Sequence, residues 1–271
     1  MVDRIGEISM KRKENGFAAT GILYTILLVF LVLMTTLLAT LSSRSRILEK
    51  LKKDAKSESA EVKNVVYANG TEIYYNPETG KKCTTAVSTP GTKSGCMKWY
   101  AFNDDDKSST VNVILDHNTT ANEAWNSTGS NSEMKEVAEA LKTDTSNWKS
   151  DLKPRLITAN EVAKITKHPT FDARKTGQSR FYLDSNNQTQ TANASNKSTY
   201  AWLFDYTNGC ANYGCNKADS STYGYWTSTS YKDNSTQAWH VNRGGGLGGS
   251  DVTNTGVGLR PVITISKSNI S

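Results

Sequence analysis

The feature that most constrains this chain is an uncharged apolar segment close to its start. Residues 17–41 contain no charged side chain, and the basic residues Lys11, Arg12 and Lys13 precede them. At about 1.5 Å rise per residue this segment forms a helix of roughly 37 Å, longer than a hydrocarbon core of about 30 Å. A secretory signal is the alternative, but its apolar region spans only about 7 to 15 residues. We therefore predict a retained transmembrane helix, with the lipid bilayer as its partner.

The rest of the chain suggests three parts: a basic leader over 1–16, a transmembrane helix and stalk over 17–63, and a large domain over 64–271. Within the stalk, residues 42–63 lack Gly and Pro, and apolar residues recur at helical spacing, namely Ile47, Leu48, Leu51 and Ala55. The helix is therefore expected to continue beyond the membrane. The apolar stripe suits either packing between subunits or a solvated spacer, and the sequence does not separate the two.

The cysteines bear on the location of the large domain. They form two close pairs, Cys83 with Cys96 and Cys210 with Cys215. Neither pair has the Cys-x2-Cys spacing of a zinc site, whereas both suit local disulfides, which persist in oxidising compartments. We predict two disulfides.

Charge gives a second view of location. Basic residues are more numerous after the span, at 44–56, than before it, which alone would favour a cytoplasmic domain. Long hydrophilic domains translocate largely regardless of charge, so we follow the cysteines. The expected protein is single-pass in the cell membrane with an extracellular C-terminal domain. The net charge of the chain is +6, and its one dense cluster of Lys and Arg residues lies at 44–56. A cluster next to the membrane favours attraction to anionic lipid or wall polymers, and we expect no nucleic-acid partner.

The junction before the span carries a first resemblance. Lys13, Glu14, Asn15, Gly16 and Phe17 together resemble the processing site of type IV prepilins, in which a short basic leader ends in Gly. The resemblance implies cleavage between Gly16 and Phe17, and pilin-like self-assembly. The fifth mature residue would be Gly21, where classical pilins carry a Glu that pairs with a neighbouring subunit. A plain signal anchor with an accidental Gly-Phe pair is the alternative.

Short turn and strand signals predict the start of the large domain. Asn69 and Gly70 lie between strand-like residues 65–67 and 71–75, which predicts a β-hairpin, and residues 76–80 form the next turn. Residues 97–102 and 111–115 read as two further strands around an acidic turn. The aspartates of that turn lack the spacing of an EF-hand loop, so we expect ordinary turn chemistry there.

Helical signals follow the strands. Thr120 to Glu123 and Thr158 to Glu161 each fit a capping box, and residues 134–141 place apolar side chains on one helical face. Residues beyond 170 read as short strands and long polar loops. The fold class is therefore α+β, with a transmembrane and stalk helix followed by an irregular antiparallel sheet and short helices.

The C-terminal third carries a second resemblance. Residues 225–229, 238–241, 243–249 and 258–263 succeed one another in the order found at the end of a C-type-lectin-like domain of the formylglycine-generating-enzyme type. This fold is common in bacterial surface and ligand-binding proteins. The resemblance implies structural roles for Trp226, Trp239 and Arg260. It also places a ligand surface on the segment matching 237–251 and on the loop before it.

The ligand-binding candidates that follow from this resemblance are Tyr231, Asp233, Trp239, His240, Asn242 and Arg243. Aromatic rings can stack on the apolar face of a sugar or peptide while polar groups fix its orientation. A solvated loop without a ligand is the alternative.

Several features argue against cofactor, metal and enzyme chemistry. Residues 244–249 match G-x-G-x-x-G, but no helical pattern follows, so we expect a flexible loop. The histidines, His117, His168 and His240, lack ligand neighbours at helical or strand spacing. Asp116 and His117 could orient a nucleophile, but no nucleophile-elbow sequence is present. The resembled enzyme uses redox-active cysteines near its end, and none follows Cys215.

The function expected from the sequence is that of a membrane-anchored, pilin-like bacterial surface protein. Its outer domain would bind a glycan, a peptide or a host or phage surface for adhesion or recognition, without catalysis. The alternative is a pseudopilin-like structural component of a secretion or DNA-uptake apparatus. A cell-wall hydrolase would need a carboxylate pair, for which Asp116 and Asp205 are the candidates.

Overall fold

The computed structural model describes residues 14–62, 65–86, 91–120, 122–184, 198–204 and 224–270. The chain falls into two compact units, one ending at Glu61 and the other beginning at Val62. The predicted Cys210–Cys215 disulfide and the candidate Asp205 lie outside the described residues.

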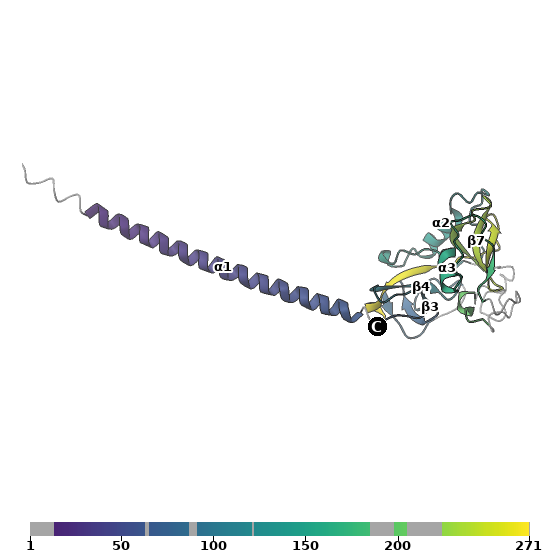
Figure 1. Cartoon of the computed structure of the whole chain (residues 1–271), viewed down its shortest axis with the longest axis horizontal. Helices are drawn as coiled ribbons and strands as arrows, with labels where there is room; N and C mark the ends of the chain where they lie inside the picture. The colour runs from purple at the N-terminus through teal and green to yellow at the C-terminus, as the bar shows by residue number, and fades with distance from the viewer. Residues whose placement is uncertain are drawn as a thin grey trace, which may run out of the picture. The chain divides into compact units, whose positions relative to one another are not determined.

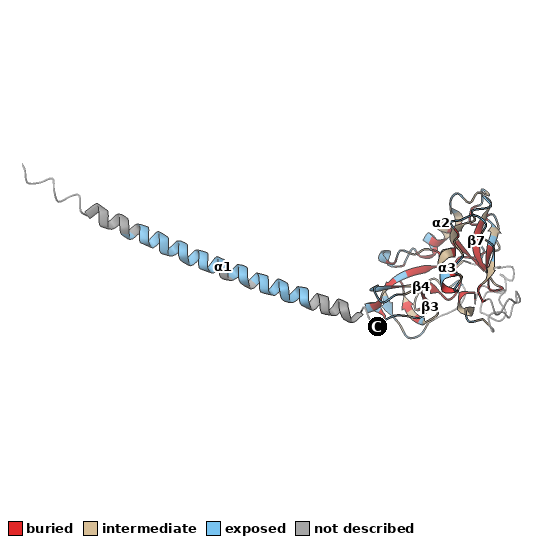
Figure 2. Cartoon of the chain, in the orientation of Figure 1, coloured by how far each residue is buried: buried red, intermediate tan, exposed pale blue. Residues whose placement is uncertain are grey.

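The first unit is the helix α1 (Glu14–Val62), shown at the purple end of the chain in Figure 1. Its described side chains are exposed, and Leu23 for example is 68% exposed (Figure 2). The Thr36 hydroxyl donates to the Val32 carbonyl at 3.0 Å, which satisfies it within an apolar stretch. Among the described residues, Leu23–Lys53 is the helical stretch long and apolar enough to cross a membrane. Such a helix acts as a membrane anchor or as a signal.

The second unit contains two antiparallel sheets. The five-stranded sheet has the order β2-β1-β3-β4-β9, with β1 (Glu72–Asn76), β2 (Lys81–Lys82), β3 (Met97–Phe102), β4 (Thr110–Leu115) and β9 (Val262–Ser266). The four-stranded sheet has the order β5-β8-β7-β6, with β5 (Phe181–Tyr182), β6 (Gly224–Ser230), β7 (Gln237–Asn242) and β8 (Gly246–Asp251).

Short helices complete this unit: α2 (Glu136–Asp144), α3 (Ala159–Ile165), and the 3-10 turns η1 (Ser150–Leu152), η3 (Ala201–Leu203) and η5 (Lys267–Asn269). The predicted α+β class, with a long apolar helix followed by antiparallel sheets and short helices, is confirmed.

The central strand β3 of the five-stranded sheet packs on both faces, whereas the edge strand β2 is exposed. In β3, Tyr100 and Phe102 belong to one cluster of buried side chains, while Trp99 and Ala101 belong to another. This is the two-residue alternation of a strand, repeated without a polar face. The centre of the sheet is therefore internal.

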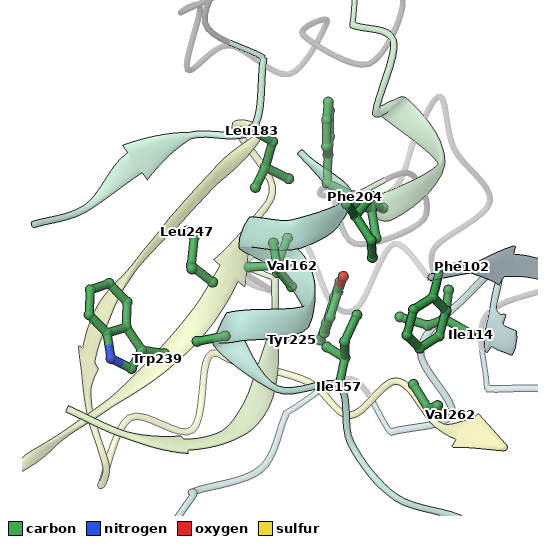
Figure 3. Packing of buried hydrophobic residues seen from close by; sticks show 14 of the residues in the cluster. Phe102, Ile114, Ile157, Val162, Leu183, Phe204, Tyr225, Trp239, Leu247 and Val262 are labelled. Atoms are coloured by element: carbon green, nitrogen blue, oxygen red, sulfur yellow. The ribbon is translucent and has the colours of Figure 1, made fainter. Parts of the chain in front are cut away.

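The first of these clusters joins the two sheets. Val162 of α3 lies among side chains of both sheets, with Leu247 and Tyr225 from one and Ile114 from the other (Figure 3). On the opposite face of the four-stranded sheet, a third cluster contains Trp226 together with apolar residues of α2. The helix α3 belongs to the first cluster alone, through which it packs with side chains of both sheets.

The structural roles predicted for Trp226, Trp239 and Arg260 are confirmed, since all three are almost completely buried. Arg260 donates from its guanidinium to the carbonyls of Leu115, Leu203 and Trp202, at 2.5, 2.8 and 3.0 Å. One buried cation therefore links the end of β4 to η3.

One of the two predicted capping boxes forms. At Thr158 the hydroxyl accepts from the Glu161 N–H at 3.1 Å, and the Glu161 carboxylate accepts from the Thr158 N–H at 2.8 Å, so α3 starts as predicted. The prediction at Thr120 is wrong, because the described residues 122–131 contain turns and no helix. Thr120 instead donates to Asp144, and its carbonyl accepts from the Leu259 N–H.

The predicted hairpin of residues 65–75 is also wrong. The turn around Gly70 exists, but residues 65–67 are not a strand, and β1 pairs with β3 and β2. The turn at 76–80 does form, and it joins β1 to β2. The Gly-rich segment is likewise not a flexible loop, because residues from Gly246 onward form β8 and pair with β7.

Covalent and ionic links tie this unit together. The predicted Cys83–Cys96 disulfide is present, with Cα atoms 6.0 Å apart, and suggests an extracytoplasmic location. A group that we call the terminal clamp consists of Lys267, Asp104, Val65 and Tyr67. The buried Lys267 ammonium contacts the Asp104 carboxylate at 2.9 Å and the Val65 carbonyl at 2.7 Å, and that carboxylate also accepts from the Tyr67 N–H at 2.9 Å.

Candidate functional site

Two of the predicted ligand residues attach their loop to a neighbouring segment. The Tyr231 hydroxyl donates to the Gln178 carbonyl at 2.8 Å, and the Asp233 carboxylate accepts from the Gly177 N–H at 2.8 Å. Tyr231 is half-buried and Asp233 is exposed. The loop after β6 and the segment 168–178 therefore form one continuous surface.

Two other predicted residues face the interior. Trp239 is 1% exposed, and the rings of Tyr231 and Phe171 lie against it with centroids 4.5 and 5.1 Å away. His240 is 9% exposed, and its Nδ1 lies 2.9 Å from the Gly248 carbonyl, an acceptor that requires the proton on Nδ1. Burial lowers the pKa of His240 to about 4. Both side chains support the surface from beneath and offer no face to a ligand in this conformation.

The last two predicted residues shape the turn between β7 and β8. The Asn242 side-chain oxygen accepts from the N–H groups of Gly244 and Gly246, at 2.9 and 3.1 Å, and Arg243 is half-buried in the same turn. Tyr231 lies at the other end of β7, where its N–H donates a hydrogen bond to the Gln237 carbonyl. At about 3.4 Å per residue, the two ends of β7 are roughly 17 Å apart, so the six residues do not converge on one site.

A cavity of about 310 Å³ lies beside the surface that Tyr231 and Asp233 support. It opens at the C-terminal end of α3 and is lined by Asn160, Ala163, Lys164, Lys167, His168, Pro169 and Phe171. Its volume is at the small end of the range for ligand pockets. We call it the α3 pocket. None of its lining residues was predicted as ligand-binding.

The end of α3 positions the basic residues of this pocket. The His168 N–H donates to the Ala163 carbonyl at 2.9 Å and the Lys167 N–H to the Lys164 carbonyl at 3.4 Å, the paired bonds of a Schellman motif. Lys167 occupies the left-handed position of that motif with φ 59°, where glycine is usual. Pro169, two residues after Lys167, prevents the helix from continuing.

The hydrogen bonds of Thr166 fix the tautomer of His168. The Thr166 hydroxyl donates its one hydrogen to the Val162 carbonyl at 2.9 Å, so it accepts from His168 Nδ1 at 3.0 Å. The other ring nitrogen, Nε2, is then an acceptor, and it forms no hydrogen bond within the described residues. Burial lowers the pKa of His168 below its usual value, and its ring stacks on Phe181 at a centroid distance of 3.9 Å. At neutral pH this imidazole is uncharged.

The opposite wall of the pocket is held rigidly. Asn160 accepts from the Ala173 N–H at 2.8 Å and donates to the Asp172 carboxylate at 3.1 Å. Phe171 lines the pocket and also packs edge-on against Trp239. The predicted Trp239 is thus one ring behind the cavity, and it positions a lining residue.

The electrostatic character of the pocket is positive. Hydrogen bonds from the Arg174 guanidinium, with a further one from Asn160, hold the pKa of Asp172 well below its usual range. Its carboxylate is therefore ionised and already paired. Neither Lys164 nor Lys167 forms an ion pair with any other described residue, and both are exposed.

The candidates for catalysis are placed differently. Asp116 and His117 are completely buried, with Oδ1 and Nδ1 2.5 Å apart, and His117 Nε2 faces the Thr92 carbonyl at 2.9 Å. The imidazole thus contacts a backbone oxygen where a nucleophile would have to be. In the part of the chain that the structure describes, no three His, Cys, Asp or Glu side chains are grouped to hold a metal ion.

Comparison with known proteins links the site to a family. Residues 97–267 match the family described as "Domain of unknown function (DUF6273)". No curated protein and no solved structure matches the chain. The matched residues include the α3 pocket and the four-stranded sheet, while α1 and the Cys83–Cys96 disulfide precede them.

Proposed function

The chain belongs to the DUF6273 family, and we propose that it is a membrane-anchored bacterial surface protein whose outer domain binds a ligand. In this proposal α1 is the anchor and the α3 pocket is the binding site, used for adhesion or recognition of a glycan, a peptide or a host or phage surface. The observation that carries the proposal is the pocket itself: a preformed cavity with two cationic side chains that pair with no described carboxylate.

The outer location is supported by two independent features. The apolar stretch of α1 is long enough to span a bilayer, and the Cys83–Cys96 disulfide lies in the unit that follows it. The burial of Trp226 and Arg260 agrees with the C-type-lectin-like order of motifs, and we propose that fold relationship for the matched domain.

A second candidate function has support from α1. The helix continues well past the apolar stretch, and Ile47, Leu48 and Leu51 are exposed along it. An apolar stripe outside a membrane favours packing against another helix. We therefore retain the pilin-like or pseudopilin-like component as an alternative, in which α1 assembles with other copies and Gly16–Phe17 is the processing site.

Binding to surface material tests the first proposal. The full chain in lipid nanodiscs is exposed to fluorescently labelled cell-wall glycans and surface peptides, and bound material is measured. We expect binding that Lys164→Glu abolishes. Lys175→Glu is the matched control, because it makes the same charge change at an exposed lysine that does not line the pocket. The proposal would be contradicted if none of the labelled glycans and peptides bound, or if both variants lost binding equally.

A further inference from the structure

We propose that the α3 pocket takes an anionic sugar unit, a hydroxylated ring that carries a carboxylate or phosphate group. The anionic group lies at Lys164 and Lys167, and a ring hydroxyl donates to His168 Nε2. This inference rests on the proposed ligand-binding function and specifies the class of ligand.

The first argument is the conformation of Lys167. The left-handed conformation costs an L-residue roughly 1 to 2 kcal/mol, and glycine avoids this cost. Lys153 has a similar φ of 45°, so the angle alone does not mark a site. Lys167 differs in that its side chain lines a cavity together with a second lysine. At this position Lys167 adds a positive charge to the cavity that the glycine usual in this conformation would not supply.

The second argument is the state of His168. A protonated histidine would be a third cation, but burial lowers the pKa of His168, and the Thr166 hydroxyl fixes the proton on Nδ1. The pocket therefore offers two cations and one neutral acceptor. An anion without a hydroxyl group, such as a simple carboxylate or sulfate, has no hydrogen to donate to that acceptor. A ligand that pairs with the cations and also with the acceptor must carry an anionic group and a hydrogen-bond donor on the same small molecule.

The third argument is the rest of the lining. Ala163, Pro169 and Phe171 give the pocket an apolar wall, which suits the C–H face of a sugar ring. The side-chain oxygen of Asn160 accepts from Ala173, and its amide group donates to Asp172. These bonds hold the wall of the pocket in place. A volume of about 310 Å³ suits one ring-sized unit and not an extended polymer segment.

The test compares sugars that share a ring. The full chain in detergent micelles is titrated by calorimetry with glucuronate, galacturonate and galactose 6-phosphate, and with glucose and galactose as neutral counterparts. We expect the acidic sugars to bind at least tenfold more tightly than the neutral ones. This preference should weaken as salt is raised, because exposed charges are screened. The uronates and the sugar phosphate separate a carboxylate preference from a phosphate preference.

Three variants within the pocket and one control outside it locate the effect. Lys164→Gln should remove the preference for acidic sugars, while Lys175→Gln, outside the pocket, should keep it. Lys167→Gly should also remove it, although the melting temperature should not fall, because glycine suits this backbone position. His168→Phe keeps an aromatic ring beside Phe181 but removes the acceptor, so it should weaken acidic and neutral sugars alike.

The outcomes separate this inference from the function on which it rests. Equal affinity for acidic and neutral sugars, or a preference that survives Lys164→Gln, overturns the anionic-sugar assignment. Binding of a neutral glycan or a peptide alone would also overturn it, while the ligand-binding function would stand. Failure to bind any cell-surface material overturns both.

Discussion

His240 is a neutral histidine in the interior, and its burial links the stability of the domain to pH. Its folded pKa is about 4, below the usual value of about 6.5, so the unfolded chain takes up a proton first as pH falls. Stability is therefore lost between about pH 6.5 and pH 4, and it is fully present above this window. The loss amounts to about 3 kcal/mol at most.

Chemical unfolding of the full chain in detergent at pH 7, 5.5 and 4 would measure this loss. Tryptophan fluorescence reports on the second unit alone, because every Trp of the sequence lies there. The pKa of His168 is also lowered, so pH dependence of the natural chain alone would not identify His240 as the cause. The comparison is therefore made with the variant His240→Asn, whose side-chain amide can replace the Nδ1–H donor but does not titrate. The dependence on pH should be shallower in this variant; equal slopes would show that His240 does not carry the effect.

Arg260 holds two separate segments through three carbonyl groups. Arg260→Lys keeps the charge, but an ammonium on a different stem cannot match the fixed fork of a guanidinium. We expect the free energy of unfolding to fall by about 3 kcal/mol, the range for breaking a buried charged hydrogen-bond network. Arg155→Lys is a control at a half-exposed arginine and should cost less. If Arg260→Lys lowered the free energy of unfolding less than Arg155→Lys does, the stabilising role given to Arg260 would be contradicted.

Some structural roles could be predicted from the sequence, and others depend on the fold. Burial of Trp226 and Arg260 followed from the order of motifs, and the structure agrees. The role that we propose for Lys167 could not be predicted from the sequence, because a lysine near a helix end is ordinarily a solvated residue. Only the backbone angle and the cavity distinguish it.

At the level of elements, the Cys83–Cys96 disulfide joins the segment after β2 to the residue before β3. The double variant Cys83→Ser, Cys96→Ser should lower the free energy of unfolding by about 3 kcal/mol, mainly by loosening the unfolded chain. Adding a reductant to the natural chain should do the same. Any effect of the reductant that remains in the double variant would come from Cys210 and Cys215. No loss in either experiment would contradict a stabilising role.

Strands with a strong apolar pattern were predictable, and elements defined by distant partners were not. Residues 97–102 and 111–115 are apolar apart from Lys98 and Asn112, so their assignment needed no knowledge of the rest of the chain. The Thr120 capping signal failed because residues far along the chain, Asp144 and Leu259, compete for its hydroxyl and carbonyl. The hairpin failed for the same reason, since β3 is a better partner for β1 than residues 65–67 are.

At the level of the whole molecule, the two candidate functions differ in what happens to the leader. If the prepilin resemblance holds, the chain extracted from membranes begins at Phe17, and Gly16→Asp leaves it uncleaved. Amino-terminal sequencing and intact mass measure both outcomes. A start at Met1 in the natural chain would remove the pilin-like alternative and leave the anchored binding protein.

The terminal clamp has a mechanical consequence. If the domain grips an object outside the cell as proposed, while its helix stays in the membrane, it is under tension, and this tension enters the second unit at its first residues. Lys267 and Asp104 hold those residues to the end of β9 and to the loop between β3 and β4. Under that proposal the load would pass into the five-stranded sheet, whereas the α3 pocket neighbours the other sheet, through the contact of His168 with Phe181 of β5 and that of Phe171 with Trp239 of β7.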